Sequence, residues 1–228
     1  MTPSIIAAHR QARLACSAGE VGPKELMPMT PTGSNLPYQT VIPSRSYREE
    51  GRPLICLLPG YERRDGGLAA HVREWAQHND AIVMQMHPHS ITWDVLCGGY
   101  GPDIAKFDLA LYGLLISQEI DLSRVALVGF SDGASYALSV GMSNGDLFTH
   151  VLAFSPGFVK SQVRHGHPQM FVAHGVADPV LPVACSRGIT EQLAQDGYEV
   201  SYCEFAGKHT VPAEIASQGL QILLAQPS

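Results

Sequence analysis

Hydrophobic residues along the chain alternate between short unbroken runs and runs spaced at helical intervals. An unbroken apolar run predicts a strand buried on both faces, as in a parallel sheet covered by helices. Such runs, together with a short segment ended by Pro43, predict strands at residues 38–42, 54–58, 81–86, 125–130, 151–154, 170–174 and 200–205.

Helical spacing fills most of the segments between these strands. Helices are expected at residues 67–77, 134–142, 189–195 and 211–225, and a short one at 5–15. A further helix follows Pro102, with Asp103 as its candidate N-cap and with Ile104, Phe107 and Leu111 on one face. Strands that alternate with helices in this way predict an α/β fold, with a mostly parallel central sheet and helices on both faces. In such sheets, ligands bind in the loops at the carboxyl ends of the strands.

Length and composition indicate one folded domain. The chain has 228 residues, 45% hydrophobic and 16% charged, so we expect a single domain over 1–228 with a core at 38–225 and a poorly defined segment at 1–35. The net charge of −6, with scattered basic residues, argues against a nucleic-acid partner. Neither a membrane-length apolar run nor a signal-peptide pattern is found, so we expect no membrane insertion and a cytoplasmic location. The low charge content hints at a further buried surface, such as that of a homodimer.

The strongest chemical signal is the pentapeptide Gly129-Phe130-Ser131-Asp132-Gly133, a G-x-S-x-G sequence. It follows an expected strand and precedes an expected helix, which is the context that a nucleophilic serine on a strained turn requires. The glycines would let adjacent backbone segments approach without a side-chain clash. We therefore interpret Ser131 as a nucleophile rather than as part of an ordinary glycine-rich turn.

A serine hydroxyl needs a base that is itself oriented by a third group. Asp178 follows the expected strand 170–174 within the sequence HGVADPVLP, and His209 follows the expected strand 200–205 within GKHTVP. Both therefore lie at strand ends, where the serine also lies. The chain order Ser131, Asp178, His209 is that of the α/β-hydrolase arrangement.

With these three motifs the chain resembles the α/β-hydrolase superfamily, and more narrowly its phospholipase/carboxylesterase-like serine esterases, over residues 38–225. The resemblance implies that Ser131 attacks an acyl carbon, that His209 carries the proton, and that Asp178 orients the imidazole. It also implies an oxyanion hole made by the backbone N–H of Asp132 and of Tyr61. Members of the family commonly have His-Gly in the Tyr61 loop where this chain has Pro-Gly, but a backbone donor tolerates that change.

The loop after the strand at 81–86 should border the pocket, so Trp93 and Tyr100 are candidate substrate-binding residues, with packing in the core as the alternative. Arg63 and Arg64 would either attract an anionic group or form a solvated face with their acidic neighbours, and the second is favoured. The connection between residues 154 and 170 is too short for a cap domain, which leaves a comparatively open site.

The ten histidines raise the alternative of a metal site. The pairs His87/His89 and His165/His167 have neither a zinc-binding spacing nor partner cysteines, so we expect no metal and no organic cofactor. The sequence thus predicts a serine hydrolase that cleaves small-molecule carboxylic esters through an acyl-enzyme. Alternatives are a thioesterase or peptidase with the same triad, or a non-catalytic binding protein of the same fold.

Overall fold

The computed structural model describes residue 14 and residues 38–43, 51–161 and 163–224, so the expected helix at 5–15 lies outside it apart from Leu14. The described strands form one sheet in the order β1-β3-β2-β4-β5-β6-β7, in which β1 is antiparallel to β3 and the other pairs are parallel. They are β1 (Tyr38–Val41), β2 (Arg52–Leu58), β3 (Ile82–Met86), β4 (Ile120–Phe130), β5 (His150–Phe154), β6 (Gln169–Gly175) and β7 (Val200–Phe205). The predicted strands and the mostly parallel sheet are confirmed.

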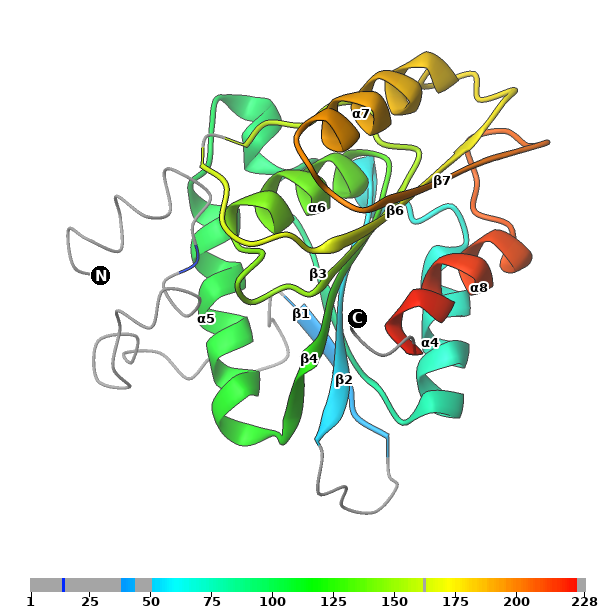
Figure 1. The fold of residues 1–228 in the computed structure, drawn as a ribbon. Coiled ribbons are helices and arrows are strands. Elements are labelled where there is room, and N and C mark those ends of the chain that lie inside the picture. The colour runs from blue at the N-terminus through cyan, green and yellow to red at the C-terminus, as the bar shows by residue number, and fades with distance from the viewer. Residues whose placement is uncertain (1–13, 15–37, 44–50, 162, 225–228) are drawn as a thin grey trace.

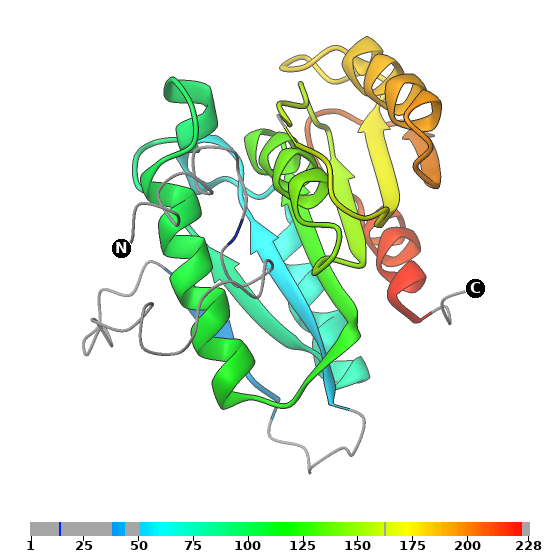
Figure 2. The same cartoon turned by 60° about the vertical axis from the view of Figure 1, so that its left-hand side comes forward.

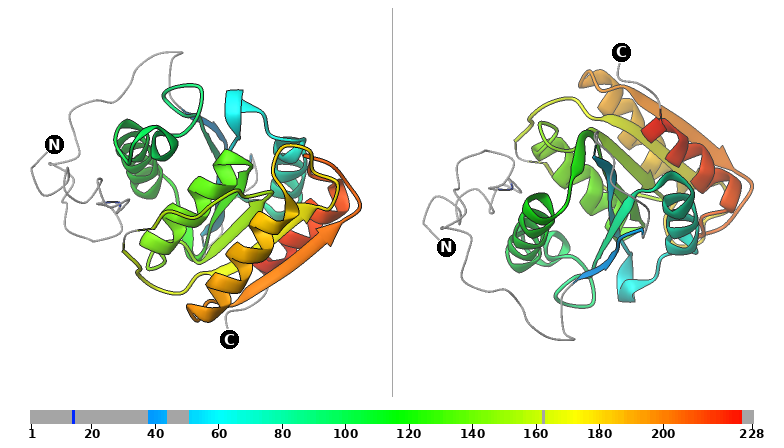
Figure 3. Two further views of the ribbon diagram at one scale, coloured as in Figure 1. Left: turned by 90° about the horizontal axis from the view of Figure 1, so that it is seen from above. Right: turned by 90° about the horizontal axis from the view of Figure 1, so that it is seen from below.

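Helices cover both faces of the sheet (Figures 1 and 3). One face carries α5 (Pro102–Ser117), α6 (Asp132–Ser143) and α7 (Val183–Gln195), and the other carries α4 (Leu68–Asn79) and α8 (Ala213–Gln221). Three short 3-10 turns complete the described elements: η1 (Tyr61–Arg63), η2 (Asp94–Cys97) and η3 (Ile222–Leu224).

The unbroken apolar run of β2 is explained by burial on both sides. Leu54, Cys56 and Leu58 belong to the core shared with α5 and α6, whereas Ile55 and Leu57 belong to the core shared with α4 and α8. Successive side chains of a strand point to opposite faces, so a strand with helices on both sides needs apolar residues at every position.

The prediction that Asp103 caps α5 is wrong. Gly101 is the N-cap, Pro102 opens the helix, and Asp103 lies in the first turn. Its carboxylate accepts the backbone N–H of His89 at 2.5 Å and of Asp94 at 2.8 Å. The loop before α5 folds back onto the start of the helix. The N–H groups of this loop donate to the Asp103 carboxylate oxygens, which are therefore not available to cap the helix.

The connection between β5 and β6 contains no helix or strand in the residues described, as a site without a cap domain requires. It runs as a loop past α6 (Figure 2). Ser135 and Ser139 of α6 accept hydrogen bonds from the backbone of this loop. Within the described part of the chain, no helix is long and apolar enough to cross a membrane.

Candidate active site

Ser131 lies on a sharp turn between β4 and α6. Its φ and ψ of 56° and −119° lie outside the regions that a residue with a side chain normally adopts. The turn is held by the Ser131 N–H, which donates to the carbonyl of Phe154 at 2.9 Å, and by the N–H groups of Ala134 and Ser135, which donate to the Ser131 carbonyl. A strained serine between a buried strand and a helix presents its hydroxyl outward at the sheet end.

The two glycines of the motif are needed because three backbone segments meet behind the serine. A Cβ at Gly129 would lie 2.2 Å from the carbonyl oxygen of Gly133, and a Cβ at Gly133 would lie 2.1 Å from that of Leu58. Side chains at either position would force α6 away from β4 or β2. The predicted strand–turn–helix context of the motif is therefore present.

The structure brings the three predicted catalytic side chains together from the loops that follow β4, β6 and β7. Oγ of Ser131 lies 2.9 Å from Nε2 of His209, and Nδ1 of His209 lies 2.6 Å from Oδ2 of Asp178. An ionised carboxylate only accepts hydrogen bonds, so Nδ1 of His209 carries a proton and neutral Nε2 is left to accept the Ser131 hydroxyl. The imidazole is thus oriented to take a proton from Ser131.

The Asp178 carboxylate is fully buried at the base of this chain of hydrogen bonds. Burial alone would raise its pKa, but hydrogen bonds from the N–H of Leu181, from His209 and from the N–H of Val180 outweigh burial and hold the pKa below its ordinary value. The two backbone donors bind Oδ1 at 3.0 and 2.8 Å and leave Oδ2 to His209. Asp178 is therefore a fixed anion at neutral pH.

The two backbone groups expected to form an oxyanion hole flank Ser131. The N–H of Asp132 opens α6, and the N–H of Tyr61 opens η1; neither donates to any residue in the described part of the chain. The loop that carries Tyr61 packs against the serine, since a Cβ at Gly60 would lie 3.0 Å from Cβ of Ser131. Two unoccupied donors beside the Ser131 hydroxyl could bind a developing negative charge.

A pocket of about 540 Å³ opens above Ser131. Its lining residues are Gly60, Tyr61, Arg64, Gly66, Phe130, Ser131, Asp132, Val180, Leu181 and His209. Sequence reasoning missed the apolar walls Val180 and Leu181, although they stand two and three positions after Asp178 in the same strand-end loop. Arg64 also lines this pocket, but its exposed side chain pairs with Glu62 at 2.7 Å, as expected of a solvated face.

Trp93 and Tyr100, predicted to bind substrate, do not line this pocket. Trp93 is fully buried and stacks on Tyr136 of α6, with ring centroids 4.5 Å apart. Tyr100 is 7% exposed and donates its hydroxyl hydrogen bond to the carbonyl of Lys160. The prediction is corrected because both rings turn inward to the core beside α6, so the alternative of packing holds.

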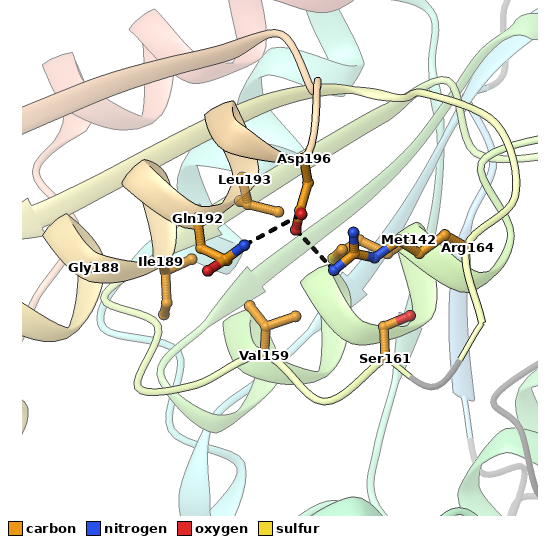
Figure 4. Close-up of a pocket in the computed structure, with 9 residues that line it drawn as sticks. All are labelled: Met142, Val159, Ser161, Arg164, Gly188, Ile189, Gln192, Leu193 and Asp196. Carbon is orange, nitrogen blue, oxygen red and sulfur yellow. Dashed lines mark hydrogen bonds and ion pairs between the residues drawn. The ribbon is translucent and has the colours of Figure 1, made fainter.

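A second pocket, of about 270 Å³, lies between α7, α6 and the β5–β6 connection (Figure 4). Met142, Val159 and Leu193 give it apolar walls, and an ion pair between Arg164 and Asp196 at 2.8 Å closes one side. It contains none of the side chains of the serine site.

A serine, an imidazole and a carboxylate linked in this order at the carboxyl end of a mostly parallel sheet form the arrangement of the α/β-hydrolases. The chain belongs to the phospholipase/carboxylesterase family, whose model matches residues 110–223, half of the chain. It is therefore a member of a family of ester hydrolases. A comparison with curated proteins gives no match.

Solved structures with the same fold include several esterases. The crystal structure of esterase PE8 is 22% identical, with a TM-score of 0.63 over 82% of this chain and 96% of its own. The Bacillus cereus carboxylesterase is 15% identical, with a TM-score of 0.60 over 82% and 92%. FphF, a fluorophosphonate-binding serine hydrolase of Staphylococcus aureus, is 12% identical, with a TM-score of 0.60 over 82% and 90%. At these identities the likeness establishes the α/β-hydrolase fold.

Proposed function

We propose that the protein is a serine hydrolase that cleaves carboxylic esters through an acyl-enzyme intermediate. The observation that carries this proposal is the continuous chain of hydrogen bonds from Ser131 Oγ through His209 to Asp178, at 2.9 and 2.6 Å. Family membership supports ester hydrolysis as the reaction class.

In the acylation step, Oγ of Ser131 attacks the ester carbonyl carbon while its proton moves to Nε2 of His209. The carbonyl oxygen becomes an oxyanion that accepts the N–H groups of Tyr61 and Asp132. Collapse of this intermediate breaks the bond to the alcohol oxygen, which leaves with the proton from His209. Asp178 stabilises the imidazolium during the step.

In the deacylation step, water enters the position of the departed alcohol. His209 takes one of its protons, the resulting hydroxide oxygen attacks the acyl carbon, and Ser131 is released with that proton restored. The net result is an acid and an alcohol, and the chemistry requires no metal or organic cofactor.

The test compares wild-type protein with Ser131→Ala on p-nitrophenyl esters of graded acyl length. We expect the variant to fold normally and to lose turnover, and wild-type protein to react with a fluorophosphonate probe at Ser131. Undiminished turnover by the variant contradicts the proposal. Including thioesters and peptide substrates separates esterase from thioesterase or peptidase activity, because the same acyl chemistry serves all three.

A further inference from the structure

The turn that presents the Tyr61 N–H is strained. Glu62 and Arg63 adopt φ values of 52° and 61°, in the left-handed region that residues with a Cβ normally avoid. Gly60 N–H donates to the carbonyl of Arg64 at 2.7 Å and closes the turn on itself. Such a conformation persists only where the surroundings hold it in place.

Two residues of the loop after β3 hold this turn, one on each side of Tyr61. The carbonyl of Ile91 accepts the N–H of Glu62 at 2.9 Å. The indole Nε1–H of Trp93 donates to the carbonyl of Pro59 at 2.8 Å. Trp93 is fully buried and its rigid ring fixes the direction of the N–H, so it holds the Pro59–Gly60 peptide, which lies one peptide before the one that carries the Tyr61 N–H.

The same loop also holds the second donor. The Thr92 hydroxyl donates to Oδ2 of Asp132 at 2.6 Å, and the Trp93 ring stacks on Tyr136, which lies one turn further along α6. The interplanar angle of 18° indicates nearly parallel rings in contact over their faces. Residues 91–93 therefore contact both segments that would supply the oxyanion donors: the Tyr61 turn through its backbone, and the start of α6 through the side chains of Asp132 and Tyr136.

The loop is itself anchored behind Trp93. Asp94 N–H donates to Oδ2 of Asp103 at 2.8 Å, and Asp103 N–H donates back to Oδ2 of Asp94 at 2.8 Å. Gly101 N–H donates to the same oxygen of Asp94. These reciprocal bonds fix the loop to the first turn of α5.

We propose that Trp93 is a positioning residue that sets the distance between the two oxyanion donors, with Thr92 fixing the Asp132 side. This inference rests on the proposed ester hydrolysis and adds residues that never touch the substrate. A pair of N–H groups stabilises a transition state only if both lie at hydrogen-bond distance from one oxygen. Trp93 links the two segments from behind and keeps them in that geometry.

The test compares Trp93→Phe with Tyr100→Phe. Each exchange removes one hydrogen bond that an aromatic side chain of the same loop donates to a backbone carbonyl. The Trp93 bond goes to Pro59 in the Tyr61 loop, whereas the Tyr100 bond goes to Lys160 in the β5–β6 connection. Trp93→Phe also shrinks a buried ring that stacks on Tyr136, so inhibitor affinity is measured besides turnover. Deleting an oxyanion donor costs about 100- to 1000-fold in kcat, so displacing one should cost about 10- to 100-fold. We expect this loss of kcat for Trp93→Phe with KM changed less than about twofold, and kcat near wild type for Tyr100→Phe.

A trifluoromethyl ketone supplies a readout that a purely structural role would not move. Its hemiketal with Ser131 places an oxyanion in the proposed hole, so its inhibition constant should rise for Trp93→Phe by the same factor by which kcat/KM falls. If Trp93→Phe fails to fold, Thr92→Val, which lacks the hydroxyl, should lower kcat about 10-fold, whereas Thr92→Ser should stay near wild type.

Equal losses for Trp93→Phe and Tyr100→Phe, or a rise in KM with unchanged inhibitor affinity, overturn the positioning role while the esterase proposal stands. If wild-type protein neither hydrolyses esters nor reacts with a fluorophosphonate, the proposed function itself fails and this inference fails with it.

Discussion

Nε2 of His174 lies 3.4 Å from Oδ2 of Asp178, the carboxylate oxygen that also accepts the hydrogen bond of His209. His174 is fully buried, and its Nε2 also lies 2.9 Å from the carbonyl oxygen of Leu181. Because both of these neighbours are acceptors, Nε2 carries the proton, and in the neutral ring Nδ1 accepts the Ser186 hydroxyl. A second imidazole thus braces the loop that carries the proposed catalytic acid.

Replacing His174 tests this brace. His174→Gln can keep an N–H near the position of Nε2, whereas His174→Leu has similar bulk and no donor. We expect His174→Leu to lower kcat about 10-fold and stability by about 1–3 kcal/mol, because the Leu181 carbonyl loses its buried partner. His174→Gln should recover most of both, measured by ester turnover and urea unfolding. Equal turnover and equal stability of the two variants would show that the N–H at the position of His174 Nε2 contributes to neither.

Gly133 marks the tightest contact behind the serine, 2.1 Å from an added Cβ to the backbone oxygen of Leu58. Backbone cannot turn aside as a side chain can, so Gly133→Ala must separate α6 from β2. We expect a loss of about 2–3 kcal/mol in the free energy of unfolding, and a lower kcat because the strand β2 leads directly into the Tyr61 loop.

Gly113 of α5 is the control for that exchange. An added Cβ there meets nothing within 4 Å, so Gly113→Ala should stabilise the protein by about 0.5–1 kcal/mol through helix propensity alone. Opposite signs for the same chemical change in two helices would identify close approach, rather than helix propensity, as the role of Gly133. Chemical denaturation of both variants measures the difference.

Asp178→Asn should leave the fold in place and remove most of the activity. The side-chain oxygen of Asn can still accept the N–H groups of Val180 and Leu181, but its amide would donate toward His209 and favour the wrong tautomer of the imidazole. We expect kcat to fall by on the order of 10⁴-fold, as an exchange of this kind does in a Ser-His-Asp triad. Turnover within 10-fold of wild type would exclude Asp178 as the orienting group.

The lowered pKa of Asp178 also gives that variant a pH signature. Burial opposes the ionised form, but the hydrogen bonds from Leu181, His209 and Val180 outweigh it, so the native pKa lies below the unfolded one. Ionised Asp178 therefore stabilises the fold above about pH 4, and this contribution is lost as the pH falls through the native pKa. The stability advantage of wild type over Asp178→Asn should shrink in that acid range.

The sequence predicts those parts of the site that depend on strand ends. Ser131, Asp178 and His209 each follow an apolar run, and a parallel sheet brings the ends of such runs to one edge. The orientation of Trp93 and Tyr100 could not be predicted in this way, because their partners, the carbonyls of Pro59 and Lys160, are distant in sequence. Apolar and aromatic composition is equally compatible with a pocket wall and with the core.

Caps and loops are similarly set by long-range contacts. Asp103 follows Pro102 as an N-cap would, but its carboxylate bonds the N–H groups of His89 and Asp94, which no local pattern reveals. Residue type predicts what a side chain can bond, and the tertiary fold decides which partner it meets.

The Asp94 carboxylate makes stability depend on pH in the opposite sense to Asp178. Burial raises the pKa of Asp94, and the neighbouring Asp103 charge adds to this, against hydrogen bonds from the backbone N–H groups of Asp103 and Gly101. Its native pKa therefore lies above the unfolded one, so the native state binds more protons and stability falls as the pH rises from about 4 through that pKa.

Asp94→Asn removes this dependence and keeps an oxygen for the same backbone donors. Oδ1 of Asp94 is buried without a hydrogen-bond partner among the described residues, so the amide replaces an unpaired anionic oxygen. In urea unfolding, the stability of Asp94→Asn relative to wild type should rise as the pH is raised from about 4 through the native pKa of Asp94. Asp121→Asn is the matched control. Burial opposes ionisation of Asp121 too, but hydrogen bonds from Ser123 and Arg124 outweigh burial and lower the pKa of Asp121. The stability of Asp121→Asn relative to wild type should therefore fall as the pH rises toward and past about 4. Parallel pH trends for the two variants would contradict the assignment of Asp94 as a carboxylate that is costly to ionise.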